Sequence, residues 1–150
     1  MKMKHYTTKM DVLSLRKKSS EFPKRKINVS MDAYQVIREF YSDDIEIYES
    51  FFLLLLNNAN TTIGYVKISQ GGVAGTIVDV KIIAKYAISC LASAVVLAHN
   101  HPSGQLFPSE QDKNITKKVV EALKLFEVRV LDHLILTPRN FYSMADEGDI

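Results

Sequence analysis

The chain has 150 residues, 47% of them hydrophobic, and this length is enough for one domain with a buried core. Its single cysteine, Cys90, excludes an internal disulfide framework and zinc modules built on cysteine pairs. No window of about 18 uncharged apolar residues occurs and the N-terminus lacks an apolar signal core, so we expect a cytoplasmic protein without a membrane span.

The net charge of +2 conceals an uneven distribution of charge. Residues 1–30 carry nine Lys/Arg and two Asp/Glu, whereas residues 31–150 carry ten and fifteen. A basic N-terminus is suited to contact with nucleic acid or an acidic partner, but a solvated, poorly ordered terminus is the simpler interpretation. We therefore divide the chain into a basic arm or linker, residues 1–26, and a body, residues 27–150.

The sequence pattern predicts little secondary structure in the arm and clear helices and strands in the body. One helical turn over residues 11–18 is the most structure that we expect in the arm. In the body, Ser30 is the expected N-cap of a helix that extends to Tyr41, with an apolar stripe that includes Val36 and Ile37.

Two strands and a second helix are predicted next. Residues 50–57 (SFFLLLLN) form a short apolar run typical of a strand covered on both faces, and residues 61–69 form a second strand. The Asn-rich turn between them predicts an antiparallel hairpin. After a break at Gly71 and Gly72, residues 79–93 carry apolar side chains at helical spacing.

The second half of the body alternates strand and helix. We expect a strand at residues 94–101, ended by Pro102 because proline cannot donate to the ladder, and a helix at residues 109–126. A strand at residues 128–137 and a short tail at residues 140–150 complete the chain. Strands and helices in this order predict an α/β layered sandwich, a mixed β-sheet with helices on its faces.

A cluster of metal-ligating residue types lies at the end of the third predicted strand. His99 and His101 are two residues apart, so they project to the same side of the strand. Catalytic zinc takes about three His or carboxylate ligands and leaves a position for water. Asp112 is the best third ligand because it continues the inward stripe of the following helix. A capping box with Ser109 also explains Asp112, but it explains neither histidine.

A zinc hydrolase also requires a base for its water. Glu49 directly precedes the apolar strand at residues 50–57 and therefore lies at the entrance to the core. A solvated position at a strand entrance is an equally ordinary interpretation, and the neighbouring acids are competitors for the role. These competitors are Asp43, Asp44 and Glu46.

The spacing of these residues resembles a known motif. The chain has His-Asn-His-Pro at residues 99–102 and, after six more residues, Ser-x-x-Asp at residues 109–112. This resembles the metal motif of the JAB/MPN (JAMM) metalloprotease superfamily, and HNHPSG narrows the resemblance to bacterial RadC-like JAB domains. Further stretches resemble that family: YESFFLLLLNNAN, GGVAGTIVD, AVVLAHNHPSG, LDHLIL and YSMADEG.

The resemblance implies roles for five residues. It implies that His99, His101 and Asp112 bind Zn²⁺. It also implies that Glu49 is the general base acting on the zinc-bound water, and that Ser109 donates a hydrogen bond to the developing oxyanion or the water. The implied reaction is hydrolysis of a peptide or isopeptide bond in a protein substrate, and the implied fold resembles a cytidine-deaminase-like sandwich.

The chain departs from the family pattern in two places. Many RadC proteins have a Pro-Arg pair before the helix that precedes the histidines, whereas this chain has Asp79, Val80 and Lys81 in that region. A substrate contact by that arginine is therefore not expected here. Longer RadC proteins also carry an N-terminal helix-hairpin-helix module, which residues 1–26 cannot supply.

Two other functions remain as alternatives, namely a DNA-associated accessory protein acting through residues 1–26 and a catalytically silent JAB interaction module. A zinc deaminase is excluded because its Pro-Cys-x-x-Cys ligation needs two cysteines. For His133, a satisfied core histidine is favoured over a partner of the metal site. We expect Asn100 to brace its loop, because it projects to the opposite side from the two histidines.

Overall fold

The computed structural model describes residues 9–72 and 75–150. The helices are α1 (Ser30–Arg38), the 3₁₀ helix η1 (Asp43–Glu46), α2 (Val80–Ser89) and α3 (Glu110–Lys124). The strands are β1 (Ser50–Leu56), β2 (Thr62–Gln70), β3 (Ala94–Asn100), β4 (Arg129–Leu136) and β5 (Phe141–Ser143).

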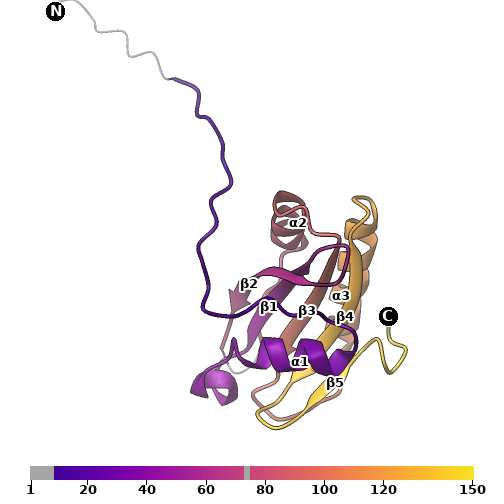
Figure 1. Cartoon of the computed structure of the whole chain (residues 1–150). Helices are drawn as coiled ribbons and strands as arrows, with labels where there is room; N and C mark the ends of the chain where they lie inside the picture. Colours follow the sequence, from indigo (N-terminus) through magenta and orange to yellow (C-terminus); the bar gives the residue numbers. More distant parts are fainter. Residues whose placement is uncertain (1–8, 73–74) are drawn as a thin grey trace, which may run out of the picture.

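The five strands form one mixed sheet in the order β2-β1-β3-β4-β5 (Figure 1). β1 pairs antiparallel with β2, which confirms the predicted hairpin, and also antiparallel with β3. β3 and β4 run parallel and are connected through α3, whereas β5 pairs antiparallel with β4. The predicted α/β class with a mixed sheet is therefore confirmed.

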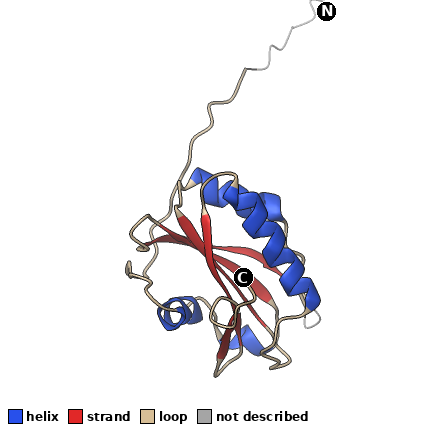
Figure 2. Ribbon diagram, turned by 90° about the vertical axis from the view of Figure 1, so that its right-hand side faces the viewer, coloured by secondary structure: helices blue, strands red, loops and turns tan. Residues whose placement is uncertain are grey.

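Helices cover both faces of the sheet (Figure 2). α1 packs on one face against side chains such as Leu54 and Val96, and α2 and α3 pack on the other against side chains such as Leu53 and Leu97. All residues of β1 and β3 are consequently buried. This burial explains why both strands have continuous apolar sequences instead of alternating ones.

The predicted ends of all three helices need correction. α2 spans only Val80–Ser89 of the predicted residues 79–93. Val29, not Ser30, is the N-cap of α1, and this helix ends at Arg38 instead of Tyr41. The Asp32 carboxylate accepts the Val29 N–H at 3.1 Å, while Ser30 Oγ donates to Asp146 at 2.5 Å. The first turn therefore does not need a serine cap. α3 ends at Lys124, two residues earlier than predicted, and Phe126, the last residue of the predicted helix, is 53% exposed.

The arm differs from the expectation in one respect. Residues 9–20 are exposed, without regular secondary structure, and lead away from the sheet (Figure 1). The helical turn predicted at residues 11–18 is therefore wrong, because a single turn without packing partners is unstable. The end of the arm lies against the body, where the Arg25 N–H donates to Thr62 Oγ1 at 2.8 Å and Phe22 is half-buried.

The C-terminal tail is also more ordered than expected. Phe141–Ser143, within the stretch predicted only as a short tail, forms the edge strand β5. Three residues are too few for a hydrophobic period to be visible, and the strand is specified by its pairing with Leu134–Leu136 of β4. Within the described part of the chain, none of the helices has the length and apolar character needed to cross a membrane.

Candidate metal centre

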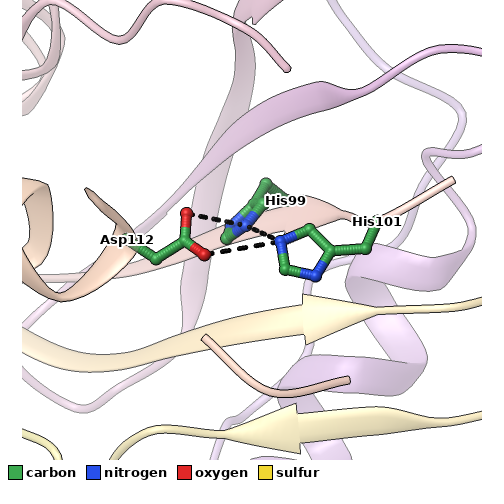
Figure 3. A group of neighbouring side chains, drawn as sticks. All are labelled: His99, His101 and Asp112. Carbon is green, nitrogen blue, oxygen red and sulfur yellow. Dashed lines mark hydrogen bonds and ion pairs between the residues drawn. The ribbon is translucent and has the colours of Figure 1, made fainter. Parts of the chain in front are cut away.

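Three side chains meet at the carboxyl end of β3 (Figure 3). The Nε2 atoms of His99 and His101 lie 2.9 Å apart. Asp112 Oδ1 lies 3.2 Å from His99 Nε2, and Asp112 Oδ2 lies 3.4 Å from His101 Nε2. One potential ligand atom from each side chain lies within 4.8 Å of the others, so the fold brings together the three residues predicted from their spacing.

Asp112 reaches the cluster from the first turn of α3. The Ser109 N–H donates to Asp112 Oδ2 at 2.7 Å, and the Asp112 N–H donates to Ser109 Oγ at 3.1 Å. The capping box considered for these two residues is therefore present. It is compatible with a metal site, because the carboxylate that caps the helix also faces both histidines.

The outer nitrogen of each histidine ring is engaged elsewhere. His101 Nδ1 lies 2.6 Å from the Gln105 carbonyl oxygen, which can only accept, so Nδ1 carries the proton. His99 Nδ1 lies 2.8 Å from His133 Nε2. Both rings thus direct Nε2 towards Asp112.

The carboxylate and the rings shift one another's pKa. Burial acts to raise the pKa of Asp112, but the interactions of its carboxylate with the His101 and His99 rings outweigh it and hold this pKa far below its ordinary value. Burial acts to lower the pKa of His101, but the bonds to Asp112 and to the Gln105 carbonyl outweigh it and raise the pKa. The cluster therefore strongly favours positive charge next to the carboxylate.

Glu49 and Ser109 line the same cavity as the cluster, a hollow of about 670 Å³. Glu49 is half-buried directly before β1. Its three competitors, Asp43, Asp44 and Glu46, all belong to η1, and none of them is among the described residues that line the cavity. Of these four acids, Glu49 is thus the one that lines the cavity, a distinction that the sequence alone could not make.

A family model for the RadC-like JAB domain matches residues 27–149. The chain belongs to the RadC-like JAB domain family. Curated relatives include a UPF0758 protein of Flavobacterium johnsoniae, 44% identical over 124 residues, which are 83% of this chain and 53% of the relative. A UPF0758 protein of Porphyromonas gingivalis is 44% identical over 138 residues, 91% of this chain and 60% of the relative.

The UPF0758 protein YfjY of Escherichia coli K12 is 44% identical over 100 residues, 67% of this chain and 62% of the relative. The chain therefore spans less than two thirds of the length of each of these relatives. Their names state no activity. The family resemblance found in the motifs is confirmed.

Within this RadC-like JAB domain, Asn100 connects the histidine strand to the segment that carries Glu49. Its side chain is 0% exposed. Oδ1 accepts the Ser50 N–H at 2.8 Å, and Nδ2 donates to the Ile45 and Tyr48 carbonyls at 2.6 and 2.8 Å. Asn100 thus braces a loop as expected, but the loop is the one before β1, 50 to 55 residues earlier in the sequence.

A glycine turn holds the other side of the Glu49 backbone. The Gly71 N–H donates to the Glu49 carbonyl at 2.8 Å, and the Glu49 N–H donates to the Gly72 carbonyl at 3.3 Å. A Cβ on Gly71 would lie 1.9 Å from the Gly75 carbonyl oxygen, so only glycine fits this close approach. The backbone of Glu49 is therefore hydrogen-bonded directly to this turn and is flanked by the Asn100 contacts.

His133 is more than a core histidine. It is 0% exposed, as the favoured interpretation required. However, its Nε2 lies 2.8 Å from His99 Nδ1, and its Nδ1 lies 2.5 Å from Thr116 Oγ1. The alternative that was ranked second, a partner of the histidine cluster, therefore also describes its contacts. The separation of 34 positions between His99 and His133 concealed this pairing in the sequence.

Proposed function

We propose that this RadC-like JAB domain is a zinc-dependent metallohydrolase, a peptidase or isopeptidase that cleaves an amide bond in a protein substrate. Family membership supports this proposal, because the motif of these domains resembles that of the JAMM metalloproteases. The observation that carries it is the close approach of two imidazole Nε2 atoms, 2.9 Å apart, beside one carboxylate.

This arrangement of electron-rich atoms requires a cation. The Gln105 carbonyl fixes the proton of His101 on Nδ1, so Nε2 of the neutral ring is a lone pair facing His99 and Asp112. Lone pairs and a carboxylate at these separations repel one another unless a proton or a metal ion lies among them. Two imidazoles and one carboxylate beside an open cavity are a donor set suited to catalytic zinc. His99, His101 and Asp112 would hold it.

Zinc held by these three residues would supply Lewis acidity, which would lower the pKa of a water to about 7 and polarise a carbonyl. Glu49, on the wall of the same cavity, accepts the proton of the attacking water and returns it to the leaving amine. Ser109 Oγ accepts the Asp112 N–H, which leaves its own proton for a hydrogen bond to the developing oxyanion.

The test separates metal binding from hydrolysis. Metal-free protein is reconstituted with zinc and its metal content is measured by mass spectrometry, while a peptide library analysed by mass spectrometry reports cleavage. We expect His99→Ala to lose zinc, and Glu49→Gln to keep zinc and lose cleavage. Glu46→Gln is the matched control, because this acid lies on η1 and is exposed, and it should keep both.

Each part of the proposal has its own contrary result. Unchanged zinc content in His99→Ala would remove the metal site. Full cleavage by Glu49→Gln would remove Glu49 as the base. Zinc binding by the wild-type protein without cleavage of any library member or protein substrate would favour the silent interaction module.

A further inference from the structure

We propose that His133 and Thr116 are positioning residues that hold His99 in the tautomer with its proton on Nδ1, so that Nε2 offers an electron pair to the cluster. The inference rests on the proposed function in that it concerns a ligand of the proposed metal. The four groups involved lie on three elements: His99 on β3, His133 on β4, and Thr116 and Asp112 on α3.

The direction of these hydrogen bonds is set at Thr116, at the end of the series that lies away from His99. Thr116 Oγ1 lies 2.6 Å from the backbone carbonyl oxygen of Asp112. Two oxygens at this distance repel unless a proton lies between them, and a carbonyl has none to give. The single hydroxyl proton of Thr116 is therefore committed to Asp112 and is not available to His133.

The next contact then has one solution. His133 Nδ1 lies 2.5 Å from Thr116 Oγ1, so the proton between them belongs to Nδ1. The ring is 0% exposed, and among the described residues no carboxylate is hydrogen-bonded to it, so a charged ring would be costly. A neutral ring carries one proton, which leaves His133 Nε2 as an acceptor.

The last contact fixes His99. Its Nδ1 lies 2.8 Å from the accepting Nε2 of His133, so Nδ1 must donate. The lone pair of His99 is then on Nε2, which faces His101 and Asp112. Phe51 stacks parallel to the His99 ring, with centroids 5.9 Å apart and planes 8° apart, and opposes its rotation.

The chain of hydrogen bonds starts at the backbone of one proposed ligand and ends at the ring of another. It therefore couples the position of Asp112 on α3 to the tautomer of His99 on β3. The reversed chain, in which Thr116 donates to His133 and His133 to His99, would place a proton on His99 Nε2 and block metal ligation. It would also leave the 2.6 Å oxygen pair without a proton.

A spectroscopic measurement on the metal-free wild-type protein distinguishes the two directions. In the ¹⁵N NMR spectrum of histidine-labelled protein at alkaline pH, we expect a pyrrole-type Nδ1 and a pyridine-type Nε2 for His99. The opposite assignment overturns the inference. Because no zinc is present, this result does not depend on whether the chain proves to be a zinc hydrolase.

Variants then test the consequence for the metal. Thr116→Val keeps the shape of the side chain and removes the hydroxyl, and we expect its affinity for zinc, measured by competition with a chromophoric chelator, to fall about 10- to 100-fold. Thr116→Ser should restore the affinity to within about threefold of wild type. Thr62→Val is the matched control. It also removes a buried hydroxyl, but at the opposite end of the sheet, and it should leave the affinity for zinc unchanged.

A folded Thr116→Val protein with wild-type zinc affinity overturns the inference. If Thr116→Val does not fold, the tautomer of the wild-type protein decides it. If the wild-type chain binds no zinc, the proposed function fails, and the NMR assignment alone confirms or overturns the positioning role.

Discussion

Replacement of Asn100 by alanine tests whether this side chain holds the segment before β1. The substitution removes three hydrogen bonds, of 2.6, 2.8 and 2.8 Å, from a side chain that is 0% exposed. At about 1 kcal/mol for each bond, the free energy of unfolding should fall by about 3 kcal/mol. Water cannot readily replace the lost partner of the buried Ser50 N–H.

The assay is urea unfolding followed by fluorescence or circular dichroism, together with hydrogen exchange of the Ser50 amide. Asn57→Ala is the control, because Asn57 is exposed and its Oδ1 accepts two backbone N–H groups, each at 3.0 Å. Water can replace those bonds, so this variant should lose less than about 1 kcal/mol. Only Asn100→Ala should speed exchange at Ser50.

The reasoning would be refuted by an Asn100→Ala protein that is no less stable than Asn57→Ala and whose Ser50 amide exchanges at the wild-type rate. Such a result would mean that the segment before β1 is held without Asn100. A second readout concerns Glu49, which this segment carries. Cleavage should decline more than zinc affinity in Asn100→Ala, because the metal ligands lie outside the displaced segment.

Three further predictions concern pH, the arm and the glycine turn. Burial lowers the pKa of His101, but the bond to Asp112 outweighs it, so the pKa in the folded state is raised above 6.5. The protonated ring therefore stabilises the fold fully below pH 6.5, and this contribution is lost as the pH rises through the folded-state pKa. The melting temperature of metal-free protein should therefore fall as the pH rises above 6.5, less so in His101→Gln, whereas zinc binding should strengthen over the same range. Deletion of residues 1–20 should change the stability by no more than about 0.5 kcal/mol, and should abolish any salt-sensitive DNA binding if the arm is responsible for it. Gly71→Ala should lower the free energy of unfolding in urea by about 1–3 kcal/mol and reduce cleavage, because the added Cβ would overlap a backbone carbonyl. Gly72→Ala is the control, because a Cβ there meets nothing within 4 Å and should have little effect. Equal effects of the two substitutions would contradict this account.

The elements that the sequence predicted correctly are those with a local hydrophobic period. β1 and β3 are continuous apolar runs, and the Asn-rich turn before β2 identifies a hairpin, so each needs only its neighbours in sequence to be recognised. β5 was missed because its three residues carry no period. The helical turn at residues 11–18 was predicted from local pattern alone, and it failed because no tertiary contact supports it.

The sequence by itself determined the family and the convergence of His99, His101 and Asp112, because strand alternation and the first turn of a helix are short-range geometry. Only the tertiary structure decided which acid shares the cavity with them, and which residues surround them. The contacts of Asn100 with the segment before β1 and of His133 with His99 join positions 34 to 55 residues apart. No local pattern records such contacts, because they exist only once β1, β3 and β4 lie side by side in the sheet.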